Sequence, residues 1–196
     1  MTARETSAVL EMLVPSDALQ YVLVDRDGVI NQDRPGSVLS RAEFALIARV
    51  PDAIALLNRK GYRVLVVTNQ ACVGRGDLSR EELDAIHALM REKIAAAGGH
   101  IDKIYVCPHT DEDDCECRKP RTGLIERARR DFGFIAADTW MIGDDLRDIE
   151  AATTAGCRPA IVYTGKLSED QLPGGVTAYR DLMNFAENVA DTEQDG

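Results

Sequence analysis

Short apolar runs alternate with segments whose apolar residues recur at helical spacing along most of this chain. Runs of this length are typical of strands buried in a parallel sheet. We expect strands over residues 20–24, 62–67, 103–106, 139–142 and 158–163. We expect helices over residues 51–60, 79–98, 123–131, 147–155 and 181–189, the second of which opens with Ser79 three residues before Glu82, a capping box.

The alternation of strands and helices predicts an α/β fold: a single doubly wound (Rossmann-like) parallel sheet of about five or six strands with right-handed crossovers. A length of 196 residues suits one domain with its own core. Because no internal repeat, low-complexity block or second domain is visible, we expect one domain across residues 1–196. Residues 1–16 and 190–196 carry no strong pattern and are expected to be poorly ordered.

Polar residues stand where three of the predicted strands end. They are Asp25 and Asp27 after the first strand, Thr68, Asn69 and Gln70 after the second, and Asp144 and Asp145 after the fourth. Side chains two apart on an extended backbone point to the same side, so Asp25 and Asp27 can face one small volume. The carboxyl ends of parallel strands share one edge, where open α/β sheets bind ligands. The alternative is that each residue is a separate helix cap or turn residue.

Carboxylates from two strand ends form a hard oxygen site that suits Mg²⁺. Lys119, which follows a cysteine-containing loop, and the hydroxyl of Thr68 suit a phosphoryl group beside that ion. One aspartate can then act as a nucleophile that forms an aspartyl-phosphate, and a second can act as general acid and then as general base. The pattern therefore indicates a Mg²⁺-dependent phosphomonoesterase.

These motifs, in this order, resemble those of the haloacid dehalogenase superfamily of phosphatases. Asp25-Arg26-Asp27-Gly28-Val29 is similar to the first motif, Thr68 to the second, Lys119 to the third, and Gly143-Asp144-Asp145 with Asp148 to the fourth. The resemblance covers roughly residues 23–157. It implies that Asp25 is the nucleophile, that Asp27 is the general acid and base, and that Thr68 and Lys119 hold the phosphoryl group. It also implies Mg²⁺ ligands, which we expect at Asp25, Asp27, Asp144 and Asp145.

A second cluster lies in the polar, acidic loop over residues 107–119. Its candidate ligands are Cys107, His109, Cys115 and Cys117. Three thiolates and an imidazole complete the tetrahedral set that Zn²⁺ takes in structural sites, with no open position for catalysis. A bound zinc would pin a loop that has almost no apolar side chains to bury. The alternatives are unpaired thiols or a disulfide between Cys115 and Cys117.

The zinc loop narrows the resemblance within the superfamily. Cys-Pro-His followed by Cys-x-Cys-Arg-Lys-Pro resembles the branch of D-glycero-D-manno-heptose 1,7-bisphosphate 7-phosphatase and histidinol-phosphate phosphatase. That branch has no large cap domain, so we expect a capless fold. The opening motif resembles the heptose enzymes more closely, which implies removal of the 7-phosphate from the heptose bisphosphate. The substrate-binding residues that the resemblance implies are Asp33, Arg34, Pro35, Gly36, Asn69, Gln70 and Arg118.

Two departures bear on the substrate. The heptose enzymes usually have Ser-Gly where this chain has Ala71-Cys72, and they usually have Lys where it has Asp145. A basic-to-acidic change at Asp145 weakens the case for a substrate with a second phosphate, or adds a metal contact. Histidinol phosphate or another small sugar phosphate is therefore an alternative substrate. A protein that binds a phosphorylated ligand without turnover is a more distant alternative.

The composition bears mainly on partners. With 23 basic and 33 acidic residues, the net charge is −10, which disfavours general nucleic-acid binding and the basic groove of a nucleic-acid end phosphatase. No apolar run approaches the roughly 18 residues of a membrane helix. We expect a cytoplasmic monomer that acts on a small phosphorylated substrate, without nucleic acid or membrane. The remaining cysteines, Cys72 and Cys157, are expected to be buried packing residues, and His87 and His100 to be solvated or core helix residues.

Overall fold

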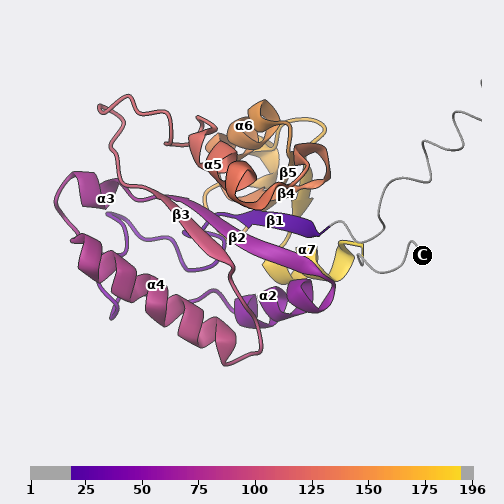
Figure 1. The fold of residues 1–196 in the computed structure, drawn as a ribbon, viewed down its shortest axis with the longest axis horizontal. Coiled ribbons are helices and arrows are strands. Elements are labelled where there is room, and N and C mark those ends of the chain that lie inside the picture. The colour runs from indigo at the N-terminus through magenta and orange to yellow at the C-terminus, as the bar shows by residue number, and fades with distance from the viewer. Residues whose placement is uncertain (1–18, 191–196) are drawn as a thin grey trace, which may run out of the picture.

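The computed structural model describes residues 19–190, which form a six-stranded sheet (Figure 1). The strands follow the order β3-β2-β1-β4-β5-β6, and every neighbouring pair is parallel. Their bounds are β1 Gln20–Val24, β2 Tyr62–Asn69, β3 Lys103–Cys107, β4 Trp140–Gly143, β5 Arg158–Val162 and β6 Thr177–Tyr179. The predicted single parallel sheet of an α/β fold is confirmed.

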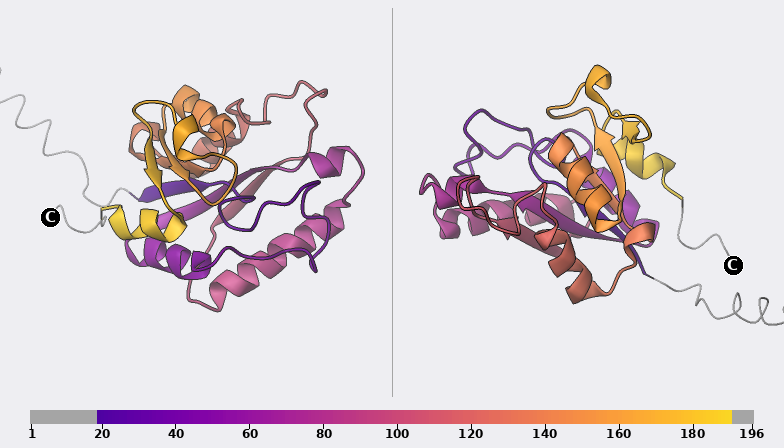
Figure 2. Two further views of the ribbon diagram at one scale, coloured as in Figure 1. Left: turned by 180° about the vertical axis from the view of Figure 1, so that it is seen from behind. Right: turned by 90° about the horizontal axis from the view of Figure 1, so that it is seen from above.

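Helices cover both faces of the sheet (Figure 2). Their bounds are α2 Val50–Arg59, α3 Ala71–Gly74, α4 Arg80–Ala95, α5 Gly123–Phe132, α6 Leu146–Ala155 and α7 Leu182–Asn188. Helices α2, α4 and α7 share one apolar cluster with Val22 and Val24 of β1, whereas α5 and α6 share the other with Tyr21 and Leu23. Because β1 is buried on both faces, its sequence is apolar at every position in this stretch rather than at alternate ones.

The structure contains short elements that the sequence pattern did not predict. Strand β6 has three residues and α3 is a single turn directly after β2, so neither is long enough to show a period. The expectations for residues 1–16 and 191–196 fall outside the described residues. Within residues 19–190, no helix combines the length and the apolar character that a membrane span requires.

Helix α4 links the fold to the candidate site. The Ser79 hydroxyl accepts a hydrogen bond from the Glu82 N–H at 3.1 Å, so Ser79 is the N-cap. The Glu82 carboxylate instead accepts from the Arg41 N–H at 3.1 Å, so the reciprocal half of the predicted capping box is not formed. The helix buries Leu83 and Ile86 completely, and the next residue, His87, is only 6% exposed. His87 Nε2 lies 3.3 Å from Nη1 of Arg26, which follows β1. His87 is therefore a buried helix residue, one of the two environments expected for it.

Candidate active site

The carboxyl ends of β1 and β4 bring three aspartates together. Asp25 follows β1, Asp144 follows β4, and Asp148 lies in the first turn of α6. The two strands are neighbours in the sheet, and Val24 is the register partner of Ile142. One carboxylate oxygen of each aspartate lies within 4.8 Å of the others. The structure thus groups Asp25 with Asp144 at one sheet edge, as the strand ends predict, and adds Asp148.

Lys119 supplies a cation to this cluster. Its Nζ lies 2.9 Å from Asp25 Oδ1 and 2.7 Å from Asp148 Oδ1, and the residue is 2% exposed. Burial favours the neutral amine, but the charges of Asp148 and Asp25 outweigh burial and hold the pKa of Lys119 above its usual value. Lys119 therefore stays charged beside Asp25, where a transferring phosphoryl group would need a positive partner.

The three carboxylates carry more negative charge than Lys119 neutralises. Burial, with added repulsion from Asp25 and Asp148, raises the pKa of Asp144 to about 8. Burial also raises the pKa of Asp25 to about 6, although Lys119 opposes the rise. Such shifts are typical of buried carboxylates that lack a sufficient cation. Three converging aspartate oxygens are ligands that suit Mg²⁺, so the residues fit that ion.

Three glycines leave the space that these carboxylates occupy. A Cβ atom on Gly28 or Gly165 would lie closer than 3.0 Å to Asp144 Oδ2, and one on Gly143 would come equally close to the Asp148 Cβ. Gly28 also has a φ of +80°, in the left-handed region that favours glycine. No side chain fits at such separations, so the placement of Asp144 and Asp148 depends on glycine at all three positions.

Asp27 lies beside this cluster in a network of donors. Arg26 Nη2 donates to both carboxylate oxygens at 2.9 Å, Asn31 Nδ2 donates at 2.8 Å, and Gln70 Nε2 donates at 2.7 Å. Burial opposes ionisation, but Arg26 and these hydrogen bonds outweigh it and hold the pKa of Asp27 below its usual value. The Asp27 carboxylate is held by these donors and does not join the three converging aspartates, which differs from the expected ligand set.

The end of β2 supports the neighbouring groups. Asn69 Nδ2 donates to the Lys119 carbonyl at 3.0 Å, and its Oδ1 accepts from the Lys119 N–H at 3.1 Å, so Asn69 fixes the lysine backbone. Gln70 is 2% exposed and donates to Asp27 Oδ2 at 2.7 Å and to Thr68 Oγ1 at 3.0 Å. Gln70 therefore organises Asp27 and Thr68, in contrast to the substrate contact expected of it.

Asp145 also lies outside the converging carboxylates, contrary to the expected Mg²⁺ ligand set. It is the N-cap of α6: its side chain accepts from the Arg147 N–H at 3.1 Å and pairs with the Arg147 guanidinium at 3.1 Å. Asp148 lies one turn further on, where its Oδ2 accepts from the N–H groups of Asp144 and Asp145 at 3.1 and 3.2 Å. The helix start therefore turns Asp148 into the cluster and Asp145 away from it.

A pocket of about 170 Å³ opens onto the carboxylates of Asp25, Asp27 and Asp148. The basic side chains that line it are Arg75, Arg118, Lys119, Arg147 and Lys166. Asp33 also lines the pocket, whereas Arg34, Pro35 and Gly36 are absent from its wall. The sequence pattern did not predict Arg75, Arg147 or Lys166. Lys166 follows β5 by four residues, so extending the strand-end rule to the fifth strand would have pointed to it.

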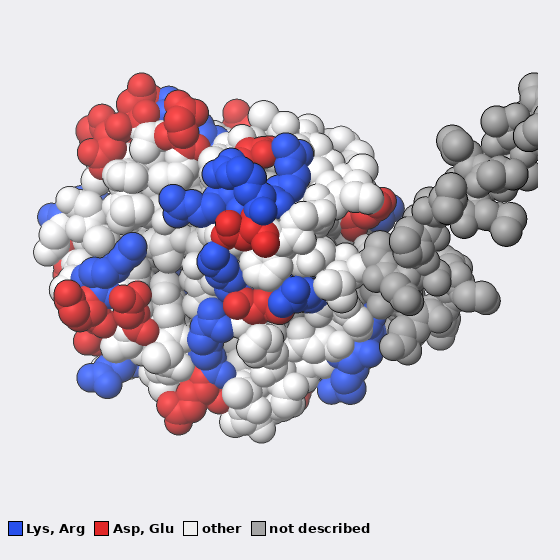
Figure 3. Space-filling view, in the orientation of Figure 1, with Lys and Arg blue, Asp and Glu red and all other residues white. Residues whose placement is uncertain are grey.

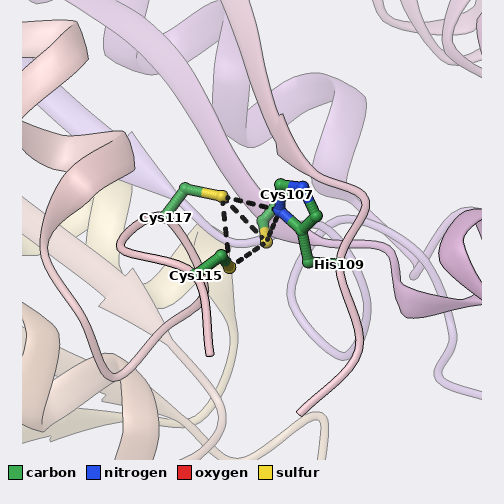
Figure 4. Close-up of side chains that lie close together, drawn as sticks. All are labelled: Cys107, His109, Cys115 and Cys117. Carbon is green, nitrogen blue, oxygen red and sulfur yellow. Dashed lines mark hydrogen bonds between the residues drawn. The ribbon is translucent and has the colours of Figure 1, made fainter. Parts of the chain in front are cut away.

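The candidate zinc ligands gather at the end of β3 and in the loop after it (Figure 4). The Sγ atoms of Cys107, Cys115 and Cys117 are 3.1 to 3.6 Å apart, and His109 Nδ1 lies 3.2 Å from Cys117 Sγ. All four ligand atoms lie within 4.8 Å of one another, as a tetrahedral site with Zn–S bonds of about 2.3 Å requires. Cys115 and Cys117 are free thiols, so the disulfide alternative does not describe this loop.

A groove of about 810 Å³ runs along β3, which is an edge strand of the sheet. Its basic lining residues are Arg80, Arg91, Lys103, Arg127 and Arg130. Basic side chains gather over α5, β3 and α4 in Figure 3. Two acidic residues, Asp84 and Asp131, also line the groove, and Lys103 pairs with Asp131 at 2.6 Å. Basic side chains therefore outnumber acidic ones along this groove although the net charge of the chain is −10.

Two family models match the chain. A model described as HAD-hydrolase-like matches residues 116–192, and one described as polynucleotide kinase 3 phosphatase matches residues 21–148. Among curated proteins, the D-glycero-beta-D-manno-heptose-1,7-bisphosphate 7-phosphatase of Neisseria meningitidis is 41% identical, over 87% of this chain and 95% of that protein. The enzyme of the same name from Pseudomonas aeruginosa is 37% identical, over 84% and 94%.

Solved structures agree with these relatives. The D,D-heptose 1,7-bisphosphate phosphatase of B. bronchiseptica, complexed with magnesium and phosphate, has a TM-score of 0.82 and 38% identity, over 86% of this chain and 96% of that one. The Burkholderia thailandensis enzyme of the same name has a TM-score of 0.67 and 35% identity, with the same coverage. With this fold, these strand ends and these relatives, the chain belongs to the HAD-like phosphatases, in the heptose-bisphosphate phosphatase family.

Proposed function

We propose that this protein is a Mg²⁺-dependent phosphomonoesterase that removes the 7-phosphate of D-glycero-D-manno-heptose 1,7-bisphosphate through an aspartyl-phosphate. One observation carries the proposal: Asp25 converges with two further carboxylates, Asp144 and Asp148, and the buried cation Lys119 contacts both Asp25 and Asp148. This arrangement gives a nucleophile, a phosphate partner and a set of metal ligands within one small volume. The relatives of the same name support the choice of substrate.

Asp25 is the nucleophile in this proposal. An oxygen of its carboxylate attacks phosphorus, the P–O bond to the sugar breaks, and the phosphoryl group is carried on Asp25. Asp25, Asp144 and Asp148 would hold Mg²⁺, which when bound neutralises charge on the phosphoryl oxygens. Lys119 supports the same oxygens from its position 2.9 Å from Asp25, and Asn69 keeps the lysine backbone in place.

Asp27 moves the proton. In the free protein its pKa is below the usual value, so it is a carboxylate and can accept a proton from the water that hydrolyses the aspartyl-phosphate. Protonation of the departing sugar oxygen requires the acid form of Asp27. The negative phosphoryl group of a bound substrate opposes ionisation of nearby carboxylates and favours that form.

The pocket mouth supports a substrate with a second phosphate. Asp145 stands where the heptose enzymes usually have Lys, but its carboxylate is neutralised by Arg147 at 3.1 Å and approached by Lys166 at 3.4 Å. Arg118, held by Asp111 at 2.5 Å, adds a further cation at the pocket wall. The acidic departure at Asp145 is thus offset by neighbouring basic side chains, which can pair with phosphate oxygens.

Further parts of the proposal concern the whole chain. We infer a single phosphatase domain across residues 1–196, supported by the one continuous sheet of residues 19–190. We also infer a location in the cytoplasm, supported by five free cysteines. We also infer a structural Zn²⁺ in the loop over residues 107–119, supported by its four converging ligand atoms. A small phosphorylated sugar suits the 170 Å³ pocket better than a polymer does.

The first prediction tests nucleophile and substrate together. Phosphate release with Mg²⁺ is measured on the heptose bisphosphate, the heptose 7-phosphate, histidinol phosphate and an oligonucleotide with a 3′-phosphate, the last because of the basic groove along β3. We expect the bisphosphate to have the highest kcat/KM. Asp25→Asn should lower kcat by about 10³-fold or more, because the carboxylate nucleophile is lost.

Circular dichroism and thermal melting of Asp25→Asn establish that the variant is folded. Turnover of Asp25→Asn at the wild-type rate would refute the nucleophile assignment. A higher kcat/KM for histidinol phosphate, or for the oligonucleotide, than for the heptose bisphosphate would assign the protein to that substrate class instead. Wild-type protein that is inactive on every ester of the panel would contradict the phosphatase proposal itself.

A further inference from the structure

Arg26 lies between the two aspartates of the first motif, and its side chain is completely buried. A buried guanidinium needs a counter-charge and acceptors for its N–H groups. Asp27 provides the counter-charge through two bonds of 2.9 Å from Nη2. Nη2 also donates to Gln70 Oε1 at 3.0 Å, and Nε lies 3.3 Å from Asp27 Oδ1.

The remaining nitrogen of Arg26, Nη1, is directed at His87 on α4. The distance from Nη1 to His87 Nε2 is 3.3 Å, and both side chains are buried. Among residues 19–190, no other acceptor bonds to Nη1. Since His87 belongs to a different layer of the fold from β1, this contact ties the orientation of the guanidinium to the position of α4.

His87 can play this part only as a neutral imidazole. Burial, reinforced by the charge of Arg26, lowers the pKa of His87 to about 3. Nε2 therefore keeps its lone pair at any physiological pH and accepts from Arg26, while the ring proton resides on Nδ1. A histidine in this state acts as a fixed acceptor and not as a proton carrier.

We infer that His87 is a positioning residue for the proton-transfer step: it orients Arg26, and Arg26 orients the Asp27 carboxylate. This inference rests on the proposed phosphatase function, in which Asp27 serves the departing sugar oxygen. Arg26 contacts both Asp27 oxygens, so a rotated guanidinium would displace the carboxylate or leave it with fewer donors. The competing explanation is that His87 only fills space on the buried face of α4, beside Ile86 and Met90.

Leaving-group dependence separates the two explanations. A sugar oxygen needs a proton as it departs, whereas the oxygen of p-nitrophenyl phosphate departs without one. His87→Leu keeps the bulk of the side chain and removes the acceptor. We expect kcat/KM on the heptose bisphosphate to fall about tenfold or more, within the range that general acid catalysis supplies. On p-nitrophenyl phosphate we expect a fall of less than about threefold.

Two further variants complete the test. His87→Gln retains an acceptor and should restore most of the activity on the bisphosphate, and it also stands in should His87→Leu fail to fold. Ile94→Ala removes buried bulk from the same helix without touching Arg26, so it should lower thermal stability and leave the ratio of the two kcat/KM values unchanged. The positioning role would be overturned if His87→Leu left both kcat/KM values unchanged, or lowered them equally on the two substrates. Activity of the wild-type protein on both esters keeps that result separate from a failure of the proposed function.

Discussion

At the scale of single residues, the site depends on side chains that the sequence pattern could locate and on contacts that it could not. Asp25 and Asp144 were predictable, because polar residues that end buried parallel strands must meet at one edge. The strand-end pattern did not favour Asp148 over Asp145, because that choice depends on where α6 begins, although the family resemblance placed Asp148 in the fourth motif. The roles of Gln70 and His87 depend on side-chain contacts across layers, which no local pattern carries.

The glycines that cradle the carboxylates yield a prediction at this scale. In Gly165→Ala the new Cβ would lie closer than 3.0 Å to Asp144 Oδ2, so Asp144 must move away from the metal cluster. We expect the Mg²⁺ concentration for half-maximal activity to rise by about 10–100-fold, as for other changes that disturb ligand orientation. A Mg²⁺ titration of phosphatase activity measures the shift.

Gly174 provides the matched control for Gly165. A Cβ atom added at Gly174 would have no heavy atom within 4 Å, and this glycine has no positive φ, so Gly174→Ala should leave the Mg²⁺ requirement unchanged. An equal Mg²⁺ concentration for half-maximal activity in Gly165→Ala and wild-type protein would show that Asp144 tolerates displacement. The close approach of Gly165 to Asp144 would then have no role in metal binding.

At the scale of elements, the long elements follow from the sequence and the short ones do not. Helix α4 shows a capping residue and a clear apolar face, so both its start and its burial were predictable. Strand β6 has three residues, too few to show a period, and within residues 19–190 it pairs only with β5. The loop over residues 107–119 is predictable for a different reason: its ligand spacing, and not any periodicity, reveals what organises it.

The zinc loop leads to an element-scale prediction. Arg118 Nη1 lies 3.3 Å from the His109 carbonyl, and Lys119 comes two residues after Cys117. We expect one Zn²⁺ per wild-type chain by elemental analysis and none in Cys115→Ser. The variant should melt at a lower temperature and lose phosphatase activity, because Arg118 and Lys119 lose their support.

Cys157→Ala serves as the control, since this buried cysteine is not one of the four residues whose ligand atoms converge in the loop. It should retain the zinc even if its melting temperature falls. Wild-type protein purified without chelator and found free of zinc would contradict the assignment, and so would full activity in a zinc-free Cys115→Ser variant.

At the scale of the whole molecule, stability should depend on pH through the metal-free carboxylates. The pKa of Asp144 rises to about 8 and that of Asp25 to about 6 in the folded protein, above their usual value of 3.8. Between the usual pKa of 3.8 and the raised values, the folded chain binds more protons than the unfolded chain. The contribution of Asp25 and Asp144 to the free energy of unfolding is therefore present at low pH and is lost as pH rises through the raised pKa values. Bound Mg²⁺ replaces those protons.

Melting temperatures with and without Mg²⁺ test this prediction. The increase caused by a saturating Mg²⁺ concentration should be larger at pH 8 than at pH 5.5, because protons compete with the ion for Asp25 and Asp144 at the lower pH. Comparing the increments cancels the titration of carboxylates elsewhere in the chain. Equal increments at the two pH values would mean that the raised pKa values do not govern metal binding.

The placement of β1 next to β4 has a consequence for the order of assembly. Asp25 lies near the start of the described chain, yet its partners are Lys119, Asp144 and Asp148, which come up to 123 residues later. Closing such long loops is entropically costly and slow, so local pairs such as β1 with β2 should form before the metal site exists. A chain in which β4 and β5 have not yet joined the sheet therefore has Asp25 without the carboxylates that complete the metal site. We expect phosphatase activity to appear only when folding is nearly finished.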